Sequence, residues 1–200
     1  MNEKILLNYV KQTAKGNGKK PTGEISITEN GTFDVTDYAE ANVNVTSKYN
    51  AKVLPRAVNN YASILAKIEE IESPYDLGTT NNIMQLFKDC YSLKKAPLMN
   101  TENITSFKEC FYGCESLVDV PLYNTENIIG NSFQNCFKSC PNLSNESLNN
   151  ILKMCINATL ITNANWKTLS FVGLSQSQAE TCQTLSNYQD FINAGWTTGY

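Results

Sequence analysis

The amino-acid sequence predicts an α+β fold, in which a short solenoid of helix-plus-strand repeats follows an N-terminal helix and a small β module. The first observation behind this prediction is a repeat with a register of 24 residues: eight residue types within residues 87–102 recur at the corresponding positions of residues 111–126, namely those of Phe87, Cys90, Leu93, Pro97, Leu98, Asn100, Thr101 and Glu102. A third copy begins near residue 133, after a two-residue insertion at Gly130 and Asn131. The second observation is that each copy places apolar residues at i, i+3, i+4 and i+7, the pattern of one helix face. The third is a short segment that reaches Pro97 or Pro121, where a proline suits the end of a strand.

Each copy is therefore expected to contribute one helix and one short strand. The predicted helices cover residues 83–90, 107–114 and 133–140, and the predicted strands cover residues 93–98 and 117–122. A period of 24 residues lies within the roughly 20 to 29 residues typical of leucine-rich repeats. A fourth helix, with Leu148, Ile151, Leu152 and Cys155 on its apolar face, follows so closely that the third strand must be shortened. The expected repeat core consists of Phe87, Cys90, Leu93, Phe111, Cys114, Leu117, Phe137, Cys140 and Leu143.

The cysteines have three interpretations. Their C-x3-C spacing in the second and third copies could supply four thiolates to a metal ion. Alignment of the copies favours core packing instead, because Cys110 and Cys136 occupy the slot of Leu86 and free cysteine behaves as a small apolar residue. Disulfide bonds are the third alternative and need Cα atoms roughly 4.4 to 6.8 Å apart. The thiols expected to form one column are Cys90, Cys114, Cys140 and Cys155.

The N-terminal third follows a different pattern. Residues 1–23 predict a short helix and a linker rich in glycine and proline. Residues 24–50 predict a β module with strands at 25–28, 32–35 and 41–45, the first two joined by a hairpin turn at Asn30–Gly31. This module has too few apolar residues for a core of its own and is the expected attachment region. Residues 51–81 should hold an amphipathic helix that caps the solenoid or forms a short oligomerising coil. Its apolar positions are Val58, Tyr61, Leu65 and Ile68.

The repeats are expected to span residues 82–157, and residues 158–200 are expected to form a C-terminal cap. The segment from Trp166 to Phe171 has a strand-like composition. Ser175 is placed to cap a helix that carries Ala179, Cys182 and Leu185. A last short helix should end at Gly195. The aromatic residues expected to close the hydrophobic column are Tyr188, Phe191, Trp196 and Tyr200.

Composition argues against catalysis and nucleic-acid binding. The chain has no histidine, so the most frequent general base and metal ligand is missing, and neither a cofactor nor a metal is expected. The net charge of −3 does not suggest the basic surface that general binding to nucleic acid requires. Carboxylates such as those of Asp89, Glu109, Glu115 and Asp119 stand at polar repeat positions, where solvation is the simplest expectation. No apolar stretch is long enough for a signal peptide or a membrane span, so we expect neither.

Three segments resemble known proteins. The unit Phe-x-x-Cys-x-x-Leu-x-x-h-Pro-Leu, at residues 87–98 and 111–122, resembles the BspA-type leucine-rich repeat of bacterial surface proteins and phage proteins. Residues 27–39 with 41–45 resemble a small β module of tail-associated structural proteins from phages of Gram-positive bacteria. Residues 191–200 are similar to the end of the same phage repeat proteins. The resemblance implies a virion component that is assembled in the host cytoplasm.

The expected function is that of a non-enzymatic phage structural protein at the tail, baseplate or capsid surface. The resemblance implies that its N-terminal region contacts other phage proteins or a second copy, and that its solenoid binds a host cell-surface polymer or protein. A bacterial BspA-like adhesion or scaffold protein is the alternative. A binding surface is expected where the copies differ on the strand side, although an ordinary solvated face is the simpler interpretation. The candidate positions are Lys94, Lys95, Met99, Val118, Asp119 and Tyr123.

Overall fold

The computed structural model describes residues 22–27, 31–33, 42–47, 51–53, 74, 77 and 80–200. The helix expected within residues 1–23 lies outside this part, and so does the amphipathic helix with Val58, Tyr61, Leu65 and Ile68. The N-terminal strands are β1 (Thr22–Ile27), β2 (Gly31–Phe33), β3 (Asn42–Ser47) and β4 (Ala51–Val53). The regular elements of residues 80–200 are the helices α3 (Asn145–Asn157), η2 (Ala164–Trp166), α4 (Leu169–Val172), α5 (Gln176–Cys182) and α6 (Tyr188–Asn193).

The N-terminal strands pair in a way that the sequence does not predict. β1 pairs with β3 in parallel, from Thr22↔Asn42 onwards, and β2 pairs with β4 in parallel, from Gly31↔Ala51 onwards. The predicted hairpin over Asn30–Gly31 is therefore wrong, because the segments on its two sides belong to different two-stranded sheets. A turn signal reports only the local chain direction, whereas parallel pairing joins segments that a longer connection separates.

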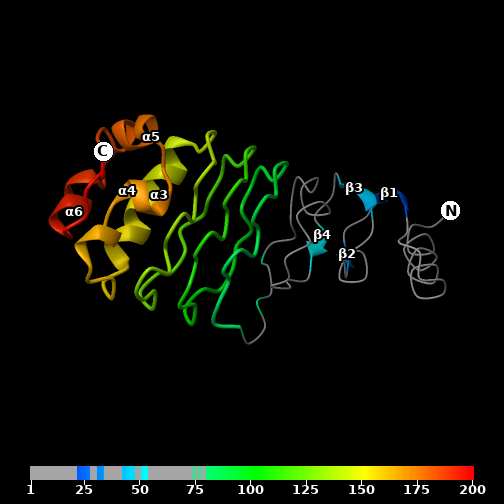
Figure 1. Cartoon of the computed structure of the whole chain (residues 1–200), viewed down its shortest axis with the longest axis horizontal. Helices are drawn as coiled ribbons and strands as arrows, with labels where there is room; N and C mark the ends of the chain where they lie inside the picture. The colour runs from blue at the N-terminus through cyan, green and yellow to red at the C-terminus, as the bar shows by residue number, and fades with distance from the viewer. Residues whose placement is uncertain are drawn as a thin grey trace.

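The prediction of an α+β solenoid with one helix and one strand in each repeat is also wrong. Residues 82–143 contain neither a helix nor a strand; they consist of turns and isolated parallel bridges. The copies nevertheless stack, and we call them layer 1 (residues 83–102), layer 2 (residues 107–126) and layer 3 (residues 133–143). Figure 1 shows them in green as segments that run side by side next to α3.

Main-chain hydrogen bonds hold the layers together. From Gln85 to Asp89 in layer 1, every second N–H donates to a carbonyl of layer 2, as from Phe87 to Cys110 at 2.9 Å. Layer 2 donates to layer 3 in the same way, as from Phe111 to Cys136 at 3.0 Å. The intervening N–H groups close tight turns within their own layer, as from Cys90 to Phe87 at 3.2 Å. The repeated sequence therefore specifies a repeated ladder in place of repeated helices.

Left-handed backbone conformations explain why the helices do not form. Two slots in each layer have positive φ, which interrupts an α-helix after a few residues. Because an isolated helix of eight residues is unstable in water, hydrogen bonding between layers prevails over the apolar i, i+3, i+4, i+7 pattern. The first slot holds Gln85, Glu109 and Asn135, and the second holds Asp89, Gly113 and Ser139.

Columns of equivalent side chains form the core. The rings of Phe87 and Phe111 stack with centroids 5.3 Å apart, and those of Phe111 and Phe137 stack at 5.7 Å. The thiol of Cys114 donates to the carbonyl of Phe87 at 3.1 Å, and the thiol of Cys140 donates to that of Phe111 at 3.0 Å. All nine residues expected to form the repeat core are buried: Phe87, Cys90, Leu93, Phe111, Cys114, Leu117, Phe137, Cys140 and Leu143.

Helix α3 closes one edge of layer 2 with side chains. The hydroxyl of Ser147 donates to the carbonyl of Val118 at 2.8 Å and accepts the N–H of Val120 at 2.8 Å. The amide of Asn150 donates to the carbonyl of Val120 at 3.0 Å. The helix begins after its N-cap Ser144 and buries the predicted face with Leu148, Ile151, Leu152 and Cys155, so this fourth helix is confirmed.

We expect Ser147→Ala to destabilise the protein. Ser147 is only 2% exposed, and its removal would leave the buried N–H of Val120 without an acceptor, at a cost of about 1 to 3 kcal/mol. Urea unfolding of the variant measures this loss. Ser177→Ala is a suitable control, because Ser177 is exposed on α5. Equal unfolding free energies for the two variants would contradict the role assigned to Ser147.

The C-terminal part corrects one prediction and confirms another. The strand expected from Trp166 to Phe171 is wrong, because η2 and α4 cover most of this segment. The predicted cap at Ser175 is confirmed: its hydroxyl accepts the N–H of Gln178, whose side chain accepts the N–H of Ser175 in return. None of the helices in the described residues is long and apolar enough to span a membrane.

Candidate functional site

Four of the predicted surface positions lie together on layers 1 and 2. Lys94, Lys95, Val118 and Asp119 are all exposed. Lys95 and Asp119 form an isolated parallel bridge, and their side-chain charges are 3.9 Å apart. Both side chains are more than half exposed, so this ion pair contributes little to stability. These residues form a mixed-charge surface that the backbone ladder holds in position.

Two exposed leucines belong to the same two layers. Leu98 and Leu122 are 57% and 49% exposed, although they are identical between the copies. Identity between repeats therefore does not imply burial here. With Val118 they add an apolar component to the charged residues. We call Lys94, Lys95, Leu98, Val118, Asp119 and Leu122 the ladder face.

Tyr123 and Met99 do not belong to the ladder face. Tyr123 is 2% exposed, and its hydroxyl donates to the carbonyl of Pro97 at 2.7 Å. Its ring stacks on Phe111 with centroids 6.1 Å apart, and burial raises the pKa of its hydroxyl well above the usual range. Met99 is half-buried and packs against the core. The prediction that Tyr123 forms part of a binding surface is wrong, because a large ring between two layers gains more from burial than from exposure.

A second polar surface follows the tight turns of the layers. The Nζ atom of Lys88 lies 2.7 Å from Oε2 of Glu109, which also accepts a hydrogen bond from the side-chain amide of Gln85 at 2.8 Å. The hydrogen bond from Lys88 lowers the pKa of the Glu109 carboxyl, and the same contact raises the pKa of Lys88. The Lys88 ammonium also lies 4.7 Å from the ring centroid of Tyr112. Glu109 is therefore paired, although the sequence suggested a solvated carboxylate.

The thiols occupy positions without catalytic potential. All seven cysteines are free and buried. Burial raises the pKa of Cys110 and Cys155, and it raises that of Cys182 to about 12. Within the residues that the structure describes, no group of three or more Cys, Asp or Glu side chains is arranged to hold a metal ion. Nucleophilic chemistry would need a thiolate, which these surroundings disfavour.

We expect the native protein to react slowly with a thiol reagent such as 5,5′-dithiobis(2-nitrobenzoate). The reactive species is the thiolate, and burial limits the access of the reagent to all seven sulfur atoms. After unfolding in guanidinium chloride all seven should react quickly. Absorbance during the reaction measures both rates. Rapid labelling of even one cysteine in the folded protein would show that a thiol is activated.

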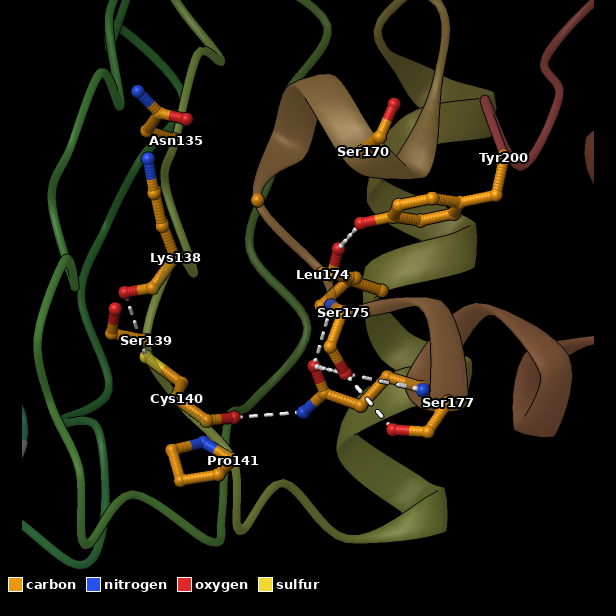
Figure 2. A pocket seen from close by; sticks show the side chains of 12 residues that line it. Asn135, Lys138, Ser139, Cys140, Pro141, Ser170, Leu174, Ser175, Ser177 and Tyr200 are labelled. Atoms are coloured by element: carbon orange, nitrogen blue, oxygen red, sulfur yellow. Dashed lines mark hydrogen bonds between the residues drawn. The ribbon is translucent and has the colours of Figure 1, made fainter.

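A pocket of about 520 Å³ lies between layer 3 and the C-terminal cap. Figure 2 shows Asn135, Lys138 and Ser139 on one wall, and Ser170, Leu174 and Tyr200 on the other. The Gln178 side chain also lines the pocket; it donates to the carbonyl of Cys140 at 2.7 Å and thereby ties α5 to layer 3. None of the pocket residues was singled out as a site from the sequence, because residues distant in the chain build it.

Known proteins give no further indication of the function of this chain. No protein-family model, curated protein or solved structure matches this sequence or its fold.

Proposed function

We propose that this chain is a non-enzymatic structural protein of a phage particle, and that its stacked layers present the ladder face to a partner. The observation that carries the proposal is the ladder itself. It fixes exposed, non-identical side chains such as Lys95 and Asp119 on a rigid hydrogen-bonded backbone. A surface of this kind suits recognition, because its residues need little ordering when they bind.

The chemistry of the chain supports a binding role. The sequence has no histidine, and the seven thiols are buried. The ladder face combines charged groups with exposed apolar side chains, and a polar surface with apolar anchors is typical of protein interfaces. The placement in a virion rests on the resemblance of residues 27–45 and 191–200 to phage tail-associated proteins.

Mass spectrometry of purified particles tests the placement. We expect the chain to co-purify with particles in a constant ratio to the other structural proteins, and labelling by negative-stain microscopy should locate it. Its absence from particles would contradict the proposal. Recovery of the protein on bacterial cell envelopes instead would favour the alternative of a bacterial adhesion or scaffold protein.

A second experiment tests the ladder face. The double variant Lys95→Glu with Leu122→Ser should reduce adsorption of particles to host cells, because it reverses a charge and removes an exposed apolar side chain. Ile129→Ser with Leu160→Ser is the matched control, since both residues are about half exposed and lie elsewhere. Melting temperature and particle assembly should be unchanged in both. Unchanged adsorption by the first variant would leave the ladder face with a purely architectural role.

A further inference from the structure

The hydrogen-bond ladder ends abruptly at Ser139. In layer 3 the N–H groups of Asn135 and Phe137 donate to the carbonyls of Phe171 and Val172, at 2.8 and 3.1 Å. Ser139 is the next residue whose N–H would donate if this alternation of hydrogen bonds continued. The equivalent residues Asp89 and Gly113 donate to the following layer at 2.7 and 2.8 Å. In the described part of the chain, however, neither the N–H nor the hydroxyl of Ser139 has a protein partner.

The chain path after α4 explains this unpaired group. Gly173 has a φ of 104°, and the chain turns there towards Ser175, which caps α5. The carbonyl of Leu174 could have continued the ladder, but it accepts the hydroxyl of Tyr200 instead. The pocket of about 520 Å³ occupies the space that this departure leaves (Figure 2). By the alternation of the ladder, the N–H of Ser139 points to this side of layer 3.

The side chains that line the pocket are rich in donors, and none of them is an Asp or Glu carboxylate. Lys138 carries the only charge among the lining side chains. It is exposed, it forms no ion pair with another described residue, and its ammonium lies 5.9 Å from the ring centroid of Tyr112. The remaining polar side chains are amides and hydroxyls, among them those of Ser139, Ser170 and Tyr200. A site with one cation, a free N–H and several hydroxyl groups favours an anionic ligand that also carries hydroxyls.

We propose that this pocket binds a small organic phosphate with a polyol body. A phosphoryl oxygen accepts hydrogen bonds from the N–H and hydroxyl of Ser139, while the Lys138 side chain turns from Tyr112 and supplies the opposite charge. The hydroxyl-lined remainder, towards Ser170 and Tyr200, holds the polyol. The volume lies within the roughly 300 to 1,000 Å³ of small-molecule sites. The proposal is independent of the virion placement and concerns a different surface from the ladder face.

Nuclear magnetic resonance of the full-length, nitrogen-15-labelled chain tests this proposal at the atom that carries it. The probes are glycerol 3-phosphate, glycerol and inorganic phosphate, each titrated to millimolar concentration. We expect glycerol 3-phosphate to move the amide signal of Ser139 in a saturable manner, and added salt to weaken the effect. Glycerol alone should leave the signal in place, and inorganic phosphate should bind more weakly than glycerol 3-phosphate.

Two variants complete the test. Lys138→Glu should weaken the binding of glycerol 3-phosphate by about tenfold or more, because it replaces attraction by repulsion at the phosphoryl group. Lys95→Glu changes the net charge equally on the ladder face and should bind like the unmodified chain. Both residues are exposed, so both variants should fold, as the rest of the spectrum will show. A stationary Ser139 signal, equal binding by the two variants, or equal binding of phosphate and glycerol 3-phosphate would each overturn the assignment.

Discussion

Phe111→Ala should cost about 3 to 5 kcal/mol of unfolding free energy, since it removes a large buried ring and leaves a cavity. Phe111 is 0% exposed and lies at the centre of the aromatic column. Its ring stacks against Phe87 and Phe137 and against Tyr123, with interplanar angles of 18°, 5° and 10°. The layers above and below are held by main-chain hydrogen bonds, which limit their collapse into the cavity.

Chemical denaturation followed by circular dichroism measures this loss. Leu122→Ala provides the control, because Leu122 lies in the same layer but is 49% exposed, and its substitution should change stability by no more than about 0.5 kcal/mol. A cost below about 1 kcal/mol for Phe111→Ala would mean that the aromatic column is not the main support of the layers.

Gly173→Ala should destabilise the cap strongly, with an expected cost of more than about 2 kcal/mol. Gly173 has a φ of 104°, which side chains rarely adopt. A Cβ atom there would also lie 2.6 Å from the backbone nitrogen of Lys138. The main chain of layer 3 or of the cap would have to shift, which would disturb the adjacent hydrogen bond from Phe137 to Val172.

Gly130→Ala separates the cost of the backbone conformation from the cost of the steric clash. Gly130 also has a positive φ, of 56°, but an added Cβ would meet only the Trp166 ring, at 3.9 Å. This variant should therefore report backbone strain without the steric clash and should be the less destabilised of the two. Thermal unfolding of both proteins gives the comparison. If Gly130→Ala loses as much stability as Gly173→Ala, the close approach of the cap to layer 3 does not contribute to the loss of stability in Gly173→Ala.

The repeat shows which structural features a sequence pattern can predict and which it cannot. Because Phe87, Phe111 and Phe137 share one slot, their stacking could be predicted from spacing alone. The backbone conformation could not, because one i, i+3, i+4, i+7 pattern fits both a short helix and a series of tight turns. The positive φ of Gln85 and Glu109 is compatible with turns and not with a helix, and neither residue type signals this conformation.

The candidate surfaces show the same limit. Lys95, Val118 and Asp119 were found from the differences between copies, and they are exposed. Tyr123 also differs between copies but lies in the core, since the residue type at a variable position does not tell which way its side chain points. The pocket at Ser139 gave no sequence signal, because it depends on where the cap leaves the ladder.

Four features could be predicted from the sequence: which residues are equivalent, which apolar side chains form columns, where α3 lies and how Ser175 caps α5. These features depend on periodicity and on contacts a few residues apart, which a single sequence records directly. Three others are visible only in the folded chain: the layers are joined by main-chain hydrogen bonds, β1 pairs with β3, and Ser139 is left unpaired beside a pocket. The reason is physical: these outcomes depend on hydrogen bonds between segments about 20 or more residues apart, which compete with local propensity and prevail only once the layers are stacked.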